Sequence, residues 1–196
     1  MKKRIFLAVC CTFCLSVTVC SAQKFRSDNY LGLSTGQWGT GGLIQTVNGF
    51  YKGPWFLGLG AGLDNYRFRS VPLFLSLTRD LPAFSKRSAF FVDLDAGTNL
   101  PWYTRKLSPY DGSTSSKFYS GLYWSASLGC KWKLSGQTGK ALLLSAGYSM
   151  KKLREDQTAP STLCTGPSPG PCDLVTQNYM YEYLNRTLFL TIGFQF

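Results

Sequence analysis

The chain has 196 residues and carries 21 lysines and arginines against 10 aspartates and glutamates, a formal net charge of +11. It contains no histidine, which excludes serine–histidine–acid triads, cysteine–histidine pairs and histidine metal sites. It also lacks a glycine-rich phosphate loop. We therefore expect a protein that is not an enzyme and uses no cofactor or metal.

The first 22 residues have the pattern of a secretory signal peptide. Lys2-Lys3-Arg4 precedes an apolar stretch, and Cys20-Ser21-Ala22 supplies the small residues of a cleavage site. We expect residues 1–22 to be removed on export and residues 23–196 to form one domain. For an exported basic chain we expect no nucleic acid partner. Outer-membrane lipid with its anionic lipopolysaccharide is the expected partner, and a solvated basic surface without any partner is the alternative.

Eight segments after this leader alternate apolar and small polar residues, the pattern of a strand with two different faces. In the third, Trp55, Leu57 and Leu59 alternate with Phe56 and glycines. The eight segments lie at about 29–37, 43–51, 55–67, 71–79, 89–99, 122–133, 141–150 and 186–196. No apolar run after the leader approaches the roughly 18 residues of a membrane helix, but a strand needs only every second residue to face lipid.

The small polar faces indicate which side of each strand lies inside. Glycine, serine and threonine dominate them, and these residues suit a narrow, crowded lumen. The longest connections, about 100–117 and 151–185, fall at one end of such a barrel, and the short connections 52–54 and 134–139 fall at the other. The connection at 80–88 is longer than this rule predicts. The expected fold is all-β: an eight-stranded antiparallel transmembrane β-barrel with short periplasmic turns and longer outer loops.

Four segments make this chain resemble a known group. They are FLGLGAGLDNYRF (56–68), VPLFLSLTRD (71–80), FFVDLDAG (90–97) and LFLTIGFQF (188–196). The chain resembles the small eight-stranded outer-membrane proteins of the OmpA/OmpX type, the outer membrane protein β-barrel domain family. The resemblance covers nearly all of the chain after the leader as a pattern of strands. It implies fold and location, and it carries over no functional residue.

The last segment places Leu188, Leu190, Ile192, Phe194 and Phe196 on one face and ends on an aromatic residue. Outer-membrane barrels commonly end in this way, because the last strand closes the barrel and carries the signal for assembly. We therefore expect the barrel assembly machinery to be a partner of this strand. The expected location is the cell outer membrane.

Charged residues on the small polar faces are expected to form ion pairs in the lumen. They are Asp64, Asp93, Asp95, Lys131 and Lys133. The two aspartates of the fifth segment should lie beside the two lysines of the sixth, and Asp64 should meet a basic neighbour such as Arg79. Little water fits into a lumen of eight strands, so such charges need partners. A proton path or a narrow ion pore is the alternative.

Aromatic residues near the ends of the outward faces are expected to form girdles at the membrane boundaries. The candidates are Tyr51, Trp55, Trp132, Tyr148 and Phe196.

The two long connections contain tyrosine and tryptophan among basic residues. The candidate contact residues are Trp102, Tyr103, Tyr110, Tyr179 and Tyr181. Such loops can bind sugars, phosphates or a partner protein. The simpler interpretation, which we prefer, is that they pack on each other as extensions of the strands.

Two cysteines, Cys164 and Cys172, flank the segment TGPSPGP in the last long connection. In an oxidising compartment we expect them to form a disulfide, which stabilises so short a loop by roughly 2–3 kcal/mol. Cys130 stands alone in a strand and is expected to act as an apolar residue.

These observations predict a non-enzymatic outer-membrane β-barrel with a structural or surface-recognition role such as adhesion. Two alternatives stay open. One is a narrow passive channel, and the other is a soluble periplasmic lipocalin-like barrel with an apolar ligand inside.

Overall fold

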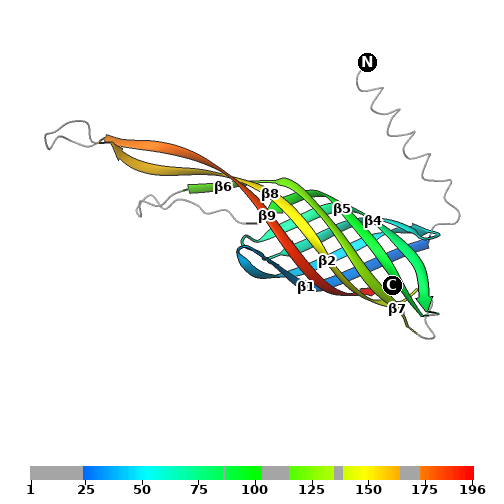
Figure 1. Ribbon diagram of the computed structural model, residues 1–196. Helices are drawn as coiled ribbons and strands as arrows, with labels where there is room; N and C mark the ends of the chain where they lie inside the picture. Colours follow the sequence, from blue (N-terminus) through cyan, green and yellow to red (C-terminus); the bar gives the residue numbers. More distant parts are fainter. Residues whose placement is uncertain (1–23, 86, 103–114, 135–138, 164–172) are drawn as a thin grey trace, which may run out of the picture.

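A computed structural model describes residues 24–85, 87–102, 115–134, 139–163 and 173–196, with the backbone alone at 115, 160–163 and 173–176. The expected leader and the two cysteines of the expected disulfide lie outside the described residues. Strands make up most of the described chain (Figure 1). They are β1 (Lys24–Gly36), β2 (Gly39–Lys52), β3 (Trp55–Asp64), β4 (Ser70–Ser85), β5 (Ser88–Pro101), β6 (Ser115–Tyr119), β7 (Gly121–Lys133), β8 (Ala141–Leu163) and β9 (Asp173–Gln195).

Eight of these strands close into an antiparallel barrel. The order runs β8-β7-β5-β4-β3-β2-β1-β9, and β9 pairs with both β1 and β8, which closes the ring. The short strand β6 lies outside the ring and pairs with β8, with Tyr119 opposite Arg154. The predicted eight-stranded antiparallel barrel is confirmed.

The apolar residues face outward, as the alternation predicts. In β3, Leu57 and Leu59 are 58% and 69% exposed, whereas Phe56 and Asp64 are buried. The same holds in β9, where Leu188, Leu190 and Ile192 are exposed and Thr187 and Thr191 are buried. Such an extensive apolar surface is unstable in water and matches the hydrocarbon of a bilayer.

No helix in the described part of the chain has the length and hydrophobicity needed to cross a membrane.

Inward-facing glycines make room for aromatic rings inside the barrel. In three register pairs, a Cβ on the glycine would lie only 2.2–2.5 Å from a ring atom of the residue opposite. The pairs are Gly60 with Phe74, Gly129 with Phe91, and Gly193 with Tyr30. Each ring occupies the space that a side chain would fill, which explains why the small polar faces are rich in glycine.

Several strand ends differ from the expected ones: β2 begins at Gly39, β4 ends at Ser85, and β8 and β9 extend into the last long connection. β1 begins at Lys24, earlier than the expected 29, and β3 ends at Asp64 instead of continuing to 67. Asp64 accepts a hydrogen bond from the backbone N–H of Tyr66 at 2.7 Å, and Arg67 takes a positive φ of 58°. These two features start a turn and therefore end the strand.

The connection expected at 151–185 is largely strand. β8 and β9 continue as a paired ribbon beyond the point where β7 and β1 stop pairing with them. We call residues 152–163 and 173–184 the arm. Figure 1 shows the arm extending well past one end of the barrel, which we call the outer end, while the C-terminus lies at the opposite, inner end. The preferred interpretation, that this connection extends the strands, agrees with the register.

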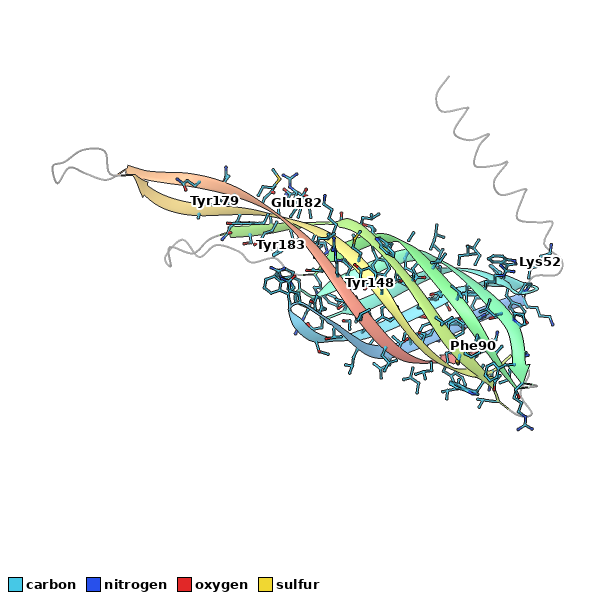
Figure 2. All side chains as sticks on the ribbon, viewed as in Figure 1. Lys52, Phe90, Tyr148, Tyr179, Glu182 and Tyr183 are labelled. Atoms are coloured by element: carbon cyan, nitrogen blue, oxygen red, sulfur yellow. The ribbon has the colours of Figure 1, made fainter. Side chains whose placement is uncertain are left out.

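Four of the five candidate girdle residues point outward. Trp55, Trp132 and Phe196 are exposed, and Tyr148 contacts the Trp124 ring at 5.5 Å. Figure 2 shows Tyr148 on the barrel wall, away from the inner end where Lys52 and Phe90 lie.

The prediction that Tyr51 belongs to the outward girdle is wrong, because its side chain faces the interior. It packs against the buried cluster that contains Val47 and Phe56. Inward positions of β2 include Leu43 and Val47, and Tyr51 shares their side of the strand because it is four residues from Val47. The exposed aromatic at this level is Phe50, whose ring lies 6.0 Å from that of Phe25.

Candidate functional site: the closed lumen and the outer arm

Aromatic side chains close the middle of the lumen. Val47, Phe56, Phe74 and Tyr123 form a buried cluster, and the rings of Phe74 and Tyr123 are 5.3 Å apart. The Tyr123 hydroxyl accepts a hydrogen bond from Gln45 Nε2 and donates one to Ser125 Oγ, both at 3.2 Å. This cluster fills the middle of the barrel, which any pore through the lumen would have to cross.

Ion pairs occupy both ends of the lumen, but with partners other than those expected. Lys151 pairs with Asp64 towards the outer end, and Lys131 pairs with Asp80 near the inner end. Arg26 Nη2 lies 2.5 Å from Asp28 Oδ2 within β1. The side chains of Lys151 and Asp64 are 5% and 1% exposed, so this pair is fully removed from solvent.

The expected pairing of Asp93 and Asp95 with Lys131 and Lys133 is wrong. The register of β5 and β7 places Asp93 opposite Ser127 and Asp95 opposite Ser125, while Lys131 lies opposite Ala89. Adjacent strands therefore bring serines to these carboxylates, and the lysines lie nearer the inner end. Lys133 is exposed there.

The expected contact between Asp64 and Arg79 is also absent, since Arg79 points outward. Its guanidinium carbon lies 4.9 Å from the centre of the Trp55 ring. Asp64 instead reaches across the lumen to Lys151 of β8, a strand that is not its neighbour in the ring.

Hydroxyl groups hold the two central carboxylates. Asp93 Oδ1 accepts hydrogen bonds from Ser76 Oγ at 2.8 Å and Thr78 Oγ1 at 2.7 Å. Asp95 Oδ2 accepts one from Ser125 Oγ at 2.6 Å, and its other oxygen has no hydrogen-bond partner among the described residues.

Because no described lysine or arginine forms an ion pair with Asp95, we expect Asp95→Asn to leave the barrel as stable as the wild type, within about 1 kcal/mol. The amide oxygen can still accept the hydrogen bond from Ser125, and a buried negative charge is removed. Thermal unfolding in detergent micelles, followed by circular dichroism, measures this. A loss of several kcal/mol would show that the carboxylate charge itself is needed.

The outer mouth is covered by an arginine enclosed in aromatic rings. The Arg67 guanidinium carbon lies 3.8 Å from the Trp38 ring centre, 4.4 Å from that of Tyr183 and 5.0 Å from that of Phe68. Phe68 also contacts Phe118 of β6, with ring centres 5.3 Å apart. These cation–π contacts join the β1–β2 and β3–β4 turns to the base of the arm.

The base of the arm is further held by a buried carboxylate. Tyr183 Oη donates a hydrogen bond to Glu155 Oε2 at 2.6 Å, and Glu155 is 8% exposed. Burial, followed by this hydrogen bond, raises the pKa of Tyr183 to about 12. The phenol therefore stays protonated and remains a donor at any physiological pH.

The two faces of the arm differ in chemistry. One continues the lumen side and carries Tyr179, Tyr181 and Tyr183 as a ladder, with successive ring centres 6.3 and 6.4 Å apart. The other carries charged pairs, including Lys152 Nζ with Glu182 Oε2 at 2.9 Å. Figure 2 shows Tyr179, Glu182 and Tyr183 beyond the outer end of the barrel.

The candidate contact residues are therefore only partly brought together. Tyr179 and Tyr181 lie side by side on the arm and are exposed, and Trp102 is exposed at the end of β5. Tyr103 and Tyr110 lie outside the described residues. The enclosure of Arg67 was missed, although the sequence holds a signal for it: Arg67 lies between Tyr66 and Phe68 in a predicted strand end.

No group of three or more aspartate, glutamate or cysteine side chains in the described part of the chain could hold a metal ion. The described cysteine, Cys130, is free and partly exposed on β7.

This architecture, with an apolar exterior, a lumen closed at its middle by aromatic residues and long strands at one end, defines the class of small eight-stranded outer-membrane β-barrels. No family model matches the sequence, and no curated protein does. Among solved structures, the chain is similar to Neisserial surface protein A, with 12% identity over 89% of this chain and 96% of that one and a TM-score of 0.54. It is also similar to the N-terminal β-barrel domain of Pseudomonas aeruginosa OprF, with 11% identity over 88% and 96% and a TM-score of 0.50. At these identities the likeness concerns the fold, and it confirms the expected OmpA/OmpX-type barrel.

Proposed function

We propose that this protein is exported to the outer membrane, is not an enzyme, and acts in surface recognition or adhesion through its arm. The observation that carries the proposal is a run of three large exposed side chains on β9. Tyr179, Met180 and Tyr181 are 44%, 61% and 41% exposed. Tyrosine and methionine are enriched in protein contact surfaces, where they supply area at low cost in conformational entropy.

A free strand edge supports the same proposal. β1 pairs with β9 only from Thr187 to Gln195, so within the described residues the arm part of β9 has a paired strand on one side alone. The unpaired N–H and C=O groups of such an edge can bind an extended segment of a partner. The enclosure of Arg67 and the Tyr183–Glu155 hydrogen bond hold this edge in place, which reduces the entropy lost on binding.

The closed lumen favours this proposal over a channel. The aromatic cluster around Tyr123 and the Lys151–Asp64 pair fill the interior at two levels. We therefore expect no stepwise conductance from the purified barrel in planar bilayers, and single-channel steps would favour the channel instead.

We expect the double substitution Tyr179→Ser and Tyr181→Ser to weaken adherence at least ten-fold, because the loss of even one tyrosine that becomes buried in a contact costs about 2 kcal/mol. The measurement compares bacteria displaying the wild type or the variant, on cultured epithelial monolayers and on an immobilised glycan array. Tyr119→Ser is the matched control, since Tyr119 is exposed on β6 but shares the opposite, charged face of the arm with Arg154. Equal adherence of the double variant and the wild type, at equal surface amounts, would contradict the proposal.

A further inference from the structure

Four hydrogen-bonding side chains interrupt the apolar outer face of the barrel. Ser27 and Asn29 lie on β1, and Thr46 and Asn48 lie on β2. The register places Ser27 opposite Asn48 and Asn29 opposite Thr46, so the four form one block, which we call the amide patch. They alternate with inward residues such as Asp28 and therefore occupy outward positions of the two strands; Asn48 is exposed, Asn29 and Thr46 are partly exposed, and Ser27 is only 6% exposed.

The amide patch lies near the middle of the apolar belt. Asn29 is the central residue of the outward row from Phe25 to Leu33 in β1, and Thr46 of β2 lies opposite it. That row spans about the 9–11 residues that cross a hydrocarbon layer as a tilted strand. The patch is thus at a depth where acyl chains, and not headgroups or water, surround the barrel.

The hydrogen bonds within the amide patch leave several of its hydrogen-bond donors and acceptors without a partner among the described residues. Asn29 Nδ2 donates to Ser27 Oγ, and Asn48 Nδ2 donates to Thr46 Oγ1, both at 3.3 Å. The amide oxygens of Asn29 and Asn48 accept no hydrogen bond from the described residues, and each amide nitrogen keeps a second N–H. Acyl chains offer neither donors nor acceptors, so exposure to lipid is costly here.

Shallow apolar furrows flank the patch on both sides. One, of about 690 Å³, is lined by Asn29 and Thr46 together with Leu31, Ile44 and Leu63. The other, of about 640 Å³, is lined by Thr46 and Asn48 together with Leu59, Leu73 and Leu75. Ala61 contributes to both furrows, and a small residue at this point allows another backbone to approach closely.

We propose that the amide patch is the contact surface for a second copy of this chain within the membrane. Two copies inserted in one bilayer share orientation and depth, so Asn48 of one copy lies at the level of Asn48 of the other. The patch presents both N–H donors and oxygen acceptors. Two copies related by a two-fold axis along the membrane normal can therefore form hydrogen bonds with each other through it. This inference depends on the membrane-spanning barrel and is independent of what the arm binds.

The test measures self-association of the full-length protein in liposomes by energy transfer between labelled copies, over a range of protein-to-lipid ratios. We expect the wild type to associate, and Asn29→Leu with Asn48→Leu to weaken association on the order of ten-fold. Thr35→Leu with Thr40→Leu is the matched control, because these threonines face outward on the same two strands but at the outer rim. The control is expected to associate like the wild type.

A second measurement uses the wild-type surface and does not depend on the leucine variant folding. A photoreactive residue at Ile44, beside the patch, should yield a covalent dimer in whole cells, whereas one at Leu128 of β7 should not. A wild type that is monomeric at every ratio, a leucine variant that associates equally well, or cross-links from Ile44 to a different protein would each overturn the proposal.

Discussion

Replacing Lys151 by methionine is expected to destabilise the barrel by about 3–5 kcal/mol. The Lys151 ammonium is paired with Asp64, and both side chains are buried, so the substitution leaves a carboxylate without its countercharge inside the lumen. Unfolding in urea from detergent micelles gives the free energy. The loss of the compact, SDS-resistant band on gels of unboiled samples provides a second readout.

Two variants separate the buried charge from general damage. Asp64→Asn combined with Lys151→Met removes both charges and should recover most of the lost stability. Lys152→Met is the matched control: Lys152 follows Lys151 directly but pairs with Glu182 on the exposed face of the arm, so its loss should cost no more than about 1 kcal/mol. Equal stability of Lys151→Met and Lys152→Met would contradict the assignment of a buried pair.

The second substitution with a large expected effect on stability is at Gly60, an inward-facing glycine whose missing side chain leaves room for a ring. Gly60→Val should destabilise the barrel by about 1–3 kcal/mol, because a Cβ at this position would lie 2.2 Å from the Phe74 ring. Phe74 belongs to the central cluster with Tyr123, so its displacement disturbs the packing of the whole lumen. Thermal unfolding of the refolded protein in micelles measures the loss.

Gly42→Val is the control for this prediction. Gly42 is also in a strand, but a Cβ there would meet no atom within 4 Å, and valine suits both the strand and an apolar surface. We expect Gly42→Val to be neutral or stabilising. If both glycine variants lose the same amount of stability, the cause is the backbone and not the Phe74 ring.

The lumen and the arm carry different parts of the proposed role. The lumen residues stabilise a closed barrel, and the arm presents exposed tyrosines beyond its outer end. A barrel closed at its middle by the aromatic cluster is a rigid anchor for the arm. Under the proposed roles, the arm binds a surface partner and the amide patch binds a second copy of the chain.

Some predictions from the sequence hold because they depend on local periodicity. Alternation with a period of two assigns each residue of a strand to one face, and Leu57, Leu59 and Leu188 lie outside as expected. The strand count, the ring closed by the last strand and the position of the long connections follow from the same pattern. Local signals also mislead where they compete, as at Tyr51, where an aromatic residue next to a turn was assigned to the exterior.

The charge partners could not be predicted, because they depend on contacts across the lumen. Neighbouring strands pair by register, which places serines opposite Asp93 and Asp95, and Lys151 meets Asp64 from a strand that does not adjoin β3. The enclosure of Arg67 likewise gathers residues from two turns and the arm. The sequence by itself thus determined the faces of the strands, since alternation is a property of consecutive residues. Only the tertiary structure decided which charges meet and how the mouth is covered, because closing the ring brings together residues far apart in the chain.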